Sequence, residues 1–203
     1  AGTTRDAIDT EVVHNGKEYI FISRSDSTLR GHYPLETELL KDNYEVNTGK
    51  TIDGEILCPF FKEGGRFTIN NVHYVKYGEE LVPANETEFA KDKTFGYTAA
   101  TMPEYVEEKT KGSYKASDVT CISLEDIHNM DIDKIEAQLM DVKDFNKIVV
   151  NAVDYVDVKV FCVALYRAMA RGKVFMFRTA AAIVKVMGAV TDQPLLTRDQ
   201  MVL

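Results

Sequence analysis

The chain has 203 residues, of which 45% are hydrophobic and 28% are charged, the proportions of an ordinary globular protein with a sizeable core. Its net charge of −8 argues against a broad surface for nucleic acid or anionic membrane, and no apolar run approaches the roughly 20 residues that cross a bilayer. Three cysteines without paired spacing and an N-terminus without a signal pattern favour reduced thiols in a cytoplasmic protein.

Short apolar runs bounded by turn residues alternate with amphipathic segments along the chain, which predicts strands alternating with helices. The predicted strands cover residues 19–22, 54–59, 119–122, 147–151 and 174–177. The predicted helices cover residues 1–18, 34–40, 103–109, 123–139, 154–171 and 181–187, with a polar stretch at 43–53 and a polar tail from 191. This order favours a single α/β domain over residues 1–203, in which a mainly parallel sheet carries helices on both faces in a Rossmann-like three-layer arrangement.

One region breaks the alternation. The apolar residues of 67–69 and 72–75 flank Asn70-Asn71, which predicts a β-hairpin with a tight turn, and residues 77–80 form a second turn. We expect this antiparallel insertion to lie at an edge of the parallel sheet or to project from it.

The loop after the first predicted strand gathers the richest polar chemistry, in Arg24, Ser25, Asp26, Ser27, Thr28, Arg30 and Gly31. In an open α/β sheet this loop lies at the carboxyl end of a strand, where ligands bind. An arginine fork pairs with both oxygens of a carboxylate, and an aspartate accepts a hydroxyl hydrogen bond or takes its proton. The pattern therefore suits a small polyhydroxy acid; a polar surface loop before a capped helix is the alternative.

Four further residues follow other predicted strands at the same edge: Asn151, Asp154, Arg178 and Thr179. Helix capping by Asn151 and Asp154, or a salt bridge from Arg178, would explain them without a ligand. Thr179 is also placed to cap the helix at 181–187. His, Cys and carboxylate residues show no metal-ligand spacing, and no glycine-rich nucleotide motif occurs, so we expect no metal site.

Asp26-Ser27-Thr28-Leu29-Arg30-Gly31 resembles the Asp-Ser-Thr-Leu-Arg-Gly signature of the four-carbon acid sugar kinase family, formerly a family of unknown function. The match is to that family's N-terminal, sugar-binding domain. It continues, in family order, through Pro59-Phe60, Gly64-Gly65-Arg66 with Thr68, residues 86–92, Asn151-Ala152 with Asp154, and residues 177–181. These segments span most of the chain, although the resemblance assigns no role to residues 86–92.

The resemblance implies an ATP-dependent kinase that phosphorylates a hydroxyl of threonate, erythronate or a 3-oxo-tetronate. Arg30, with Arg24, would hold the substrate carboxylate, and Asp26 would bind a substrate hydroxyl or act as the catalytic base. Ser27 and Thr28 would add hydrogen bonds, and the remaining substrate-binding candidates are Ser25, Gly31, Asn151, Asp154, Arg178 and Thr179.

ATP and Mg²⁺ would engage a C-terminal nucleotide-binding domain of the same protein. That domain, and an earlier strand ending in an Asp-Asp-x-Thr-Gly type motif, do not occur in this sequence. We therefore expect the chain to bind neither cofactor, to bind sugar acid poorly and to turn over nothing by itself. A homodimer is a possible assembly, and neither nucleic acid nor membrane is an expected partner.

Two other functions remain open at this stage. The first is a sugar-acid binding module without catalysis on the same fold, which the absence of a downstream ATP-binding domain would favour. The second is an α/β enzyme that acts on another small acid, which activity of the isolated chain would favour.

Overall fold

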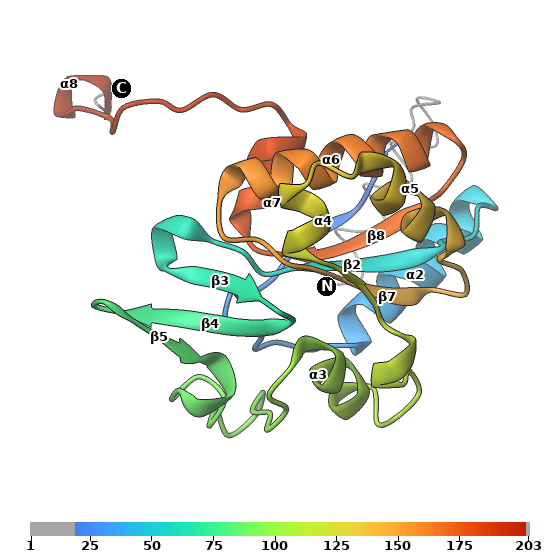
Figure 1. Ribbon diagram of the computed structural model, residues 1–203, viewed down its shortest axis with the longest axis horizontal. Coiled ribbons are helices and arrows are strands. Elements are labelled where there is room, and N and C mark those ends of the chain that lie inside the picture. Colours follow the sequence, from blue (N-terminus) through green and yellow to red (C-terminus); the bar gives the residue numbers. More distant parts are fainter. Residues whose placement is uncertain (1–18, 202–203) are drawn as a thin grey trace.

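A computed structural model describes residues 19–201, so the helix predicted over 1–18 lies outside the described residues. Five parallel strands form the main sheet in the order β1-β8-β2-β7-β6 (Figure 1). They are β1 (Ile22–Arg24), β2 (Gly54–Cys58), β6 (Thr120–Ile122), β7 (Asn146–Val150) and β8 (Phe175–Thr179). The predicted parallel α/β sheet is confirmed.

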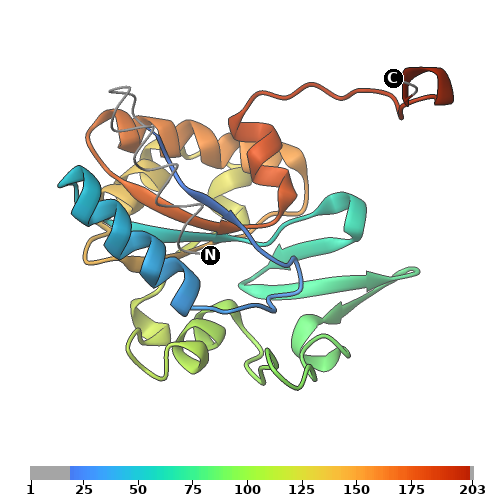
Figure 2. The ribbon, with the colours of Figure 1, turned by 180° about the vertical axis from the view of Figure 1, so that it is seen from behind.

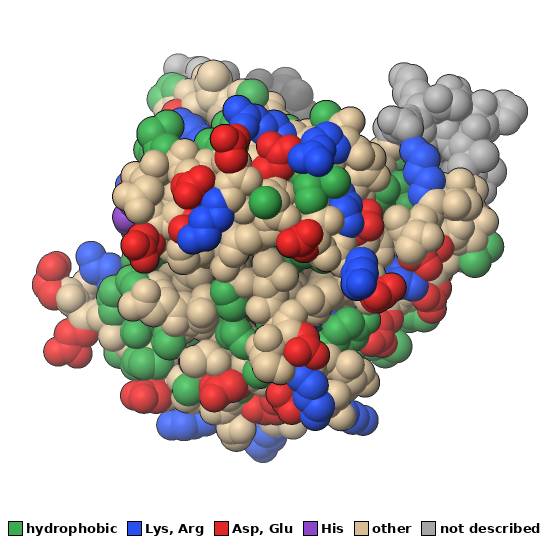
Figure 3. Space-filling view, turned by 45° about the vertical axis from the view of Figure 1, so that its right-hand side comes forward, with side chains coloured by type: hydrophobic (Ala, Val, Ile, Leu, Met, Phe, Trp, Pro, Cys, Tyr) green, Lys and Arg blue, Asp and Glu red, His purple; other side chains and the backbone are tan. Residues whose placement is uncertain are grey.

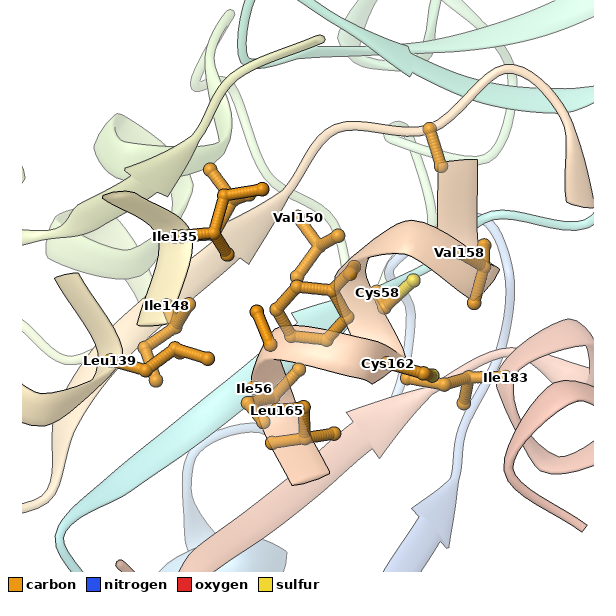
Figure 4. Close-up of a cluster of buried hydrophobic side chains, with 14 of the residues drawn as sticks. Ile56, Cys58, Ile135, Leu139, Ile148, Val150, Val158, Cys162, Leu165 and Ile183 are labelled. Atoms are coloured by element: carbon orange, nitrogen blue, oxygen red, sulfur yellow. The ribbon is translucent and has the colours of Figure 1, made fainter. Parts of the chain in front are cut away.

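Helices cover both faces of this sheet (Figures 1 and 2). One face carries α4 (Leu124–His128), α5 (Ile132–Asp141), α6 (Tyr155–Ala170) and α7 (Ala181–Met187), and the other carries α2 (Leu35–Thr48) and α3 (Met102–Lys109). All five residues of β2 are buried, because side chains alternate between two covered faces. Ile56 and Cys58 pack in the larger core under α6, shown in Figure 4, whereas Leu57 packs against α3 residues such as Val106.

The predicted hairpin is present and belongs to a three-stranded antiparallel sheet of β3 (Arg66–Ile69), β4 (Val72–Tyr77) and β5 (Glu80–Pro83). Asn70 and Asn71 both have positive φ, 49° and 65°, as a two-residue turn between twisted strands requires. Strand β5 was not predicted. The small sheet projects from the carboxyl edge of the main sheet, to which Thr68 is joined by a pair of backbone hydrogen bonds with Ala152.

Four local predictions need correction. The segment predicted as one helix over 123–139 forms two, α4 and α5, because Met130 has a φ of 54° and Asp131 caps α5. Helix α2 continues to Thr48 instead of giving way to a polar stretch at 43, because Tyr44 is buried against Ile52 and Phe145. The first strand begins at Ile22 and not at residue 19. Thr179 does not cap the helix that follows, since Ala180 occupies the N-cap position without a side-chain cap.

The long helix α6 begins with both aspartates that the sequence offered as caps. Asp154 accepts a hydrogen bond from the Val156 amide, and Asp157 accepts one from the Asp154 amide, so the two form a capping box. The remaining elements are one-turn helices at Lys62–Gly64, Ala84–Glu86 and Ala116–Asp118, and α8 (Arg198–Met201) at the end of an extended tail. No helix in residues 19–201 combines the length and the apolar character that a bilayer span needs.

Candidate functional site

The polar loop after β1 lies where the sequence placed it, at the carboxyl edge of the sheet. The Ser25 amide donates a 2.8 Å hydrogen bond to the Thr179 carbonyl of the neighbouring strand end, which ties the β1–α2 loop to β8. The loop borders an open hollow of about 560 Å³. The hollow is lined by Arg24, Ser25, Asp26, Arg30, Gly31, His32, Glu36, Asp92 and Phe95.

Asp26, Thr28 and Arg30 form a hydrogen-bonded cluster in this loop. Nε of Arg30 donates to Oδ2 of Asp26 at 2.7 Å and contacts Oγ1 of Thr28 at 3.1 Å, and the Thr28 hydroxyl donates to the same Asp26 oxygen. Burial raises the pKa of the Asp26 carboxyl, but the hydrogen bonds from Arg30 and Thr28 outweigh it and hold the pKa below its usual value. Asp26 is therefore ionised at neutral pH.

The cluster leaves binding capacity on both charged groups. Within residues 19–201, Oδ1 of Asp26 makes no side-chain hydrogen bond, and the terminal nitrogens of Arg30 make none. The Arg30 guanidinium lies 5.1 Å from the centre of the Phe89 ring, which supports its flat face. Arg24, at the end of β1, is exposed, and its side chain has no hydrogen-bond or ion-pair partner among the described residues. The hollow thus offers hydrogen-bond donors for a carboxylate beside an acceptor for a hydroxyl.

Arg178 lies behind the loop and not in the hollow. It is only 5% exposed, its guanidinium packs 4.8 Å from the Tyr33 ring, and its Nη2 donates weakly to the carbonyls of Leu29 and Arg30, at 3.5 and 3.4 Å. No salt bridge to a carboxylate forms within the described chain. Thr179 is fully buried beside it, and its hydroxyl has no hydrogen-bond partner there.

Asn151 and Asp154 lie at the same carboxyl edge of the sheet, but their side chains bind other parts of the chain and not the β1–α2 loop. Asn151 is 1% exposed, and its side-chain oxygen accepts from the Asn71 amide at 2.7 Å while its nitrogen donates to the Ile122 carbonyl at 2.8 Å. Asp154 caps α6 and forms an ion pair with Lys62. Neither residue lines the hollow, and their predicted contact with substrate stays a prediction.

The rest of the lining of the hollow comes from residues that the sequence did not mark as a site. Asp92 accepts hydrogen bonds from the amides of Thr94 and Phe95, and the Phe95 ring stacks edge-on against His32. Glu36, on the first turn of α2, accepts a 2.5 Å hydrogen bond from the Ser23 hydroxyl. The only sequence signal for these residues was the family resemblance of residues 86–92. That segment supplies Asp92 to the lining of the hollow and the Phe89 ring to the Arg30 guanidinium.

Titratable side chains do not cluster as a metal site requires: in the described part of the chain, no group of three or more His, Cys, Asp or Glu could hold a metal ion. The three cysteines are free, with Cys58 and Cys162 buried and Cys121 half-buried. On the face that Figure 3 shows, acidic and basic side chains are interspersed, which is typical of an ordinary solvated surface.

Residues 2–187 match the family described as the sugar-binding N-terminal domain, and the chain belongs to this family. The resemblance of its motifs to the sugar-binding domain of the four-carbon acid sugar kinases is confirmed. The comparison with curated proteins gave no match.

Two solved structures share the fold. A Haemophilus influenzae protein of the DUF1537 family is 20% identical with a TM-score of 0.59, over 88% of this chain and 39% of its own. A DUF1537 domain from Bordetella bronchiseptica, solved with bound citrate as a domain-swapped dimer, is 19% identical with a TM-score of 0.58, over 90% of this chain and 39% of its own. The chain therefore spans about two fifths of the length of each.

Proposed function

We propose that this chain is the substrate-binding part of an ATP-dependent kinase that phosphorylates a hydroxyl of four-carbon acid sugars of the threonate, erythronate or 3-oxo-tetronate type. The observation that carries the proposal is the Asp26–Arg30 pair, which presents a cation and an ionised acceptor side by side in an open hollow. Membership of a sugar-binding family supports it. The citrate in the Bordetella structure, a hydroxy acid, is consistent with it.

The geometry favours a carboxylate with a hydroxyl close to it. Nε of Arg30 donates to Oδ2 of Asp26 at 2.7 Å, which holds the two side chains together. One ligand could therefore reach both the terminal nitrogens of Arg30 and Oδ1 of Asp26. The carboxylate of a sugar acid would accept from the terminal nitrogens of Arg30, with Arg24 as a second cation. A neighbouring hydroxyl would donate to Oδ1 of Asp26, while Ser25 and Gly31, which also line the hollow, would face the rest of the ligand.

Asp26 also suits the role of catalytic base. Phosphoryl transfer depends mainly on positioning and on stabilising charge, and kinases use an aspartate to accept the proton of the attacking hydroxyl. The low pKa of Asp26 keeps the carboxylate ready to accept a hydroxyl hydrogen bond at neutral pH. The hydroxyl bound to Oδ1 would then be the one that attacks the γ-phosphoryl group.

ATP and Mg²⁺ would be held by the nucleotide-binding domain of the complete protein. This chain would then supply the sugar-acid site. The complete protein would act in the cytoplasm, in keeping with three free cysteines. A homodimer fits the domain-swapped dimer of the Bordetella structure.

Calorimetric titration of the chain with four-carbon sugar acids, and with succinate as a hydroxyl-free control, tests the proposal. We expect threonate or erythronate to bind and succinate to bind at least tenfold more weakly, because succinate leaves the Asp26 acceptor unpaired. Arg30→Ala should abolish binding, whereas the matched control Arg171→Ala, in a surface ion pair with Glu136, should not change it. Equal affinity for succinate, or an unchanged Arg30→Ala variant, would contradict the assigned site.

Adding ATP and Mg²⁺ to the complete protein separates the kinase from the alternatives. Phosphorylated sugar acid supports the kinase. Binding without phosphorylation indicates a sugar-acid binding module, and turnover by the chain alone indicates an independent enzyme.

A further inference from the structure

Buried side chains hold the main chain of the β1–α2 loop through its carbonyl oxygens. Each carbonyl from residue 27 to residue 30 accepts a hydrogen bond from a side chain. The pairs are Ser27 with Nε2 of His73 at 2.7 Å, Thr28 with the Tyr97 hydroxyl at 3.0 Å, Leu29 with the Tyr105 hydroxyl at 2.7 Å, and Arg30 with Nη2 of Arg178 at 3.4 Å.

The four donors come from different parts of the fold. His73 lies on β4, Tyr97 on the segment before α3, Tyr105 on α3 and Arg178 on β8. They are 3%, 5%, 1% and 5% exposed, and none of them lines the hollow. They therefore act on a ligand in the hollow only through the loop that they hold.

The chemistry of the His73 contact is fixed by its two partners. A carbonyl oxygen only accepts, so the nitrogen facing Ser27 must carry the hydrogen. The other ring nitrogen, Nδ1, lies 3.0 Å from the Thr68 hydroxyl, which then donates to it. The neutral ring thus links strand β3 to the loop, and the antiparallel sheet takes part in shaping the hollow.

The loop needs such support because its backbone is unusual. Leu29, a residue with a side chain, has a φ of 70°, and Gly31 has a φ of 129°. A bulky residue in the left-handed region costs free energy that surrounding contacts must offset. Arg30, which would bind the ligand, lies between these two positions.

We propose that His73, Tyr97, Tyr105 and Arg178 are positioning residues, which hold the β1–α2 loop so that Asp26 and Arg30 face a ligand together. The inference rests on the proposed function for the identity of the ligand, but the order of the loop is measurable without one. It also gives Arg178 a role other than the direct substrate contact that the family resemblance implies.

Tyr97→Phe and Tyr105→Phe test the proposal, because each removes one hydroxyl and keeps a buried ring of the same shape. Tyr166→Phe is the control, since the exposed Tyr166 side chain also donates its hydroxyl to a backbone carbonyl, that of Met187 at the end of α7. Amide hydrogen exchange of the ligand-free proteins reports on the Leu29 amide, which donates to the Asp26 carbonyl at 3.1 Å. Threonate affinity of the same proteins is measured by calorimetry.

We expect faster exchange in residues 26–31 of the two loop variants, a threonate affinity roughly threefold to tenfold lower, and neither change in Tyr166→Phe. Unchanged exchange in both loop variants would overturn the proposal, as would faster exchange without any loss of affinity in a protein that binds threonate. If the complete protein binds no sugar acid, the proposed function fails and the exchange rates alone decide whether these residues order the loop.

Discussion

Nε of Arg30 lies 2.7 Å from Oδ2 of Asp26, and the Thr28 hydroxyl donates to that same oxygen. One carboxylate oxygen is therefore used inside the loop, while the other remains for a ligand. The Arg30 side chain is used in the same way: its Nε bonds within the loop, and its two terminal nitrogens remain for a ligand. This division fixes both charged groups before any ligand arrives, which lowers the entropy that binding must overcome.

Asp26→Asn should weaken the binding of sugar acid by roughly tenfold to a hundredfold. The amide keeps the shape of the side chain but removes the charge that attracts Arg30 and strengthens the hydrogen bond to a hydroxyl. Calorimetric titration with threonate measures the loss. Asp133→Asn serves as the control, because Asp133 forms only an exposed ion pair with Arg167 on the helical face. Equal affinities for Asp26→Asn and wild type would remove Asp26 from the site.

The buried His73 ring should make the folded chain less stable in mild acid. Burial lowers its pKa from 6.5 to about 4, so between these values the unfolded chain binds a proton that the folded chain excludes. The contribution of the neutral His73 ring to the free energy of unfolding is therefore complete above pH 6.5 and is lost as the pH falls toward 4. From the linkage relation we expect a loss of about 2 kcal/mol between pH 7 and pH 4.5.

Urea unfolding of wild type and His73→Gln across this range isolates the effect. Glutamine keeps a donor for the Ser27 carbonyl but does not titrate, so the difference in unfolding free energy between the two proteins should shrink as the pH falls. A constant difference from pH 7 to pH 4.5 would show that His73 is not the group responsible.

Lys147→Met should destabilise the fold by about 3–5 kcal/mol, because it leaves the buried Glu55 carboxylate without its counter-ion. Nζ of Lys147 lies 2.7 Å from Oε2 of Glu55, both side chains are fully buried, and the two residues are register partners on β7 and β2. The ammonium group also lies 3.5 Å from the centre of the Phe145 ring. Burial lowers the pKa of Lys147, which the contact with Glu55 partly offsets.

The double variant Glu55→Leu with Lys147→Met is the informative control. Two apolar residues of similar size need no charge partner, so we expect the double variant to be more stable than Lys147→Met alone. Urea unfolding measures the free energy of unfolding of the single and the double variant. A double variant that is as unstable as the single one would mean that packing volume, and not the unpaired charge, sets the loss.

The sequence was sufficient for features that depend on local patterns. Apolar runs located the strands, Asn70-Asn71 located the hairpin turn, and the shared edge of parallel strands located the polar loop. It was insufficient where a side chain of the same type could serve two roles. Arg178 suits a carboxylate equally well, and only its burial under Tyr33 shows that it faces the back of the loop.

Contacts between distant segments account for the other differences. Asp92 and Phe95 reach the hollow because the antiparallel sheet and the segment after it fold back over the carboxyl edge, which no spacing in the sequence reveals. Helix α2 extends to Thr48 because Tyr44 packs in a core with Ile52, Phe145 and Met176. Tertiary burial outweighed the polar local composition in that segment.

Asn151→Ala separates a structural role from a direct contact with substrate. The Asn151 side chain makes three hydrogen bonds, two to Asn71 at the hairpin turn and one to the Ile122 carbonyl, so its loss leaves buried partners unsatisfied. We expect a loss of about 2–3 kcal/mol in unfolding free energy, against almost none for Asn43→Ala on α2, whose side chain accepts an exposed hydrogen bond from Asn47. The threonate affinity of the folded variant should stay within about twofold of wild type, because Asn151 lies outside the hollow. A large loss of affinity with unchanged stability would instead return Asn151 to the substrate site.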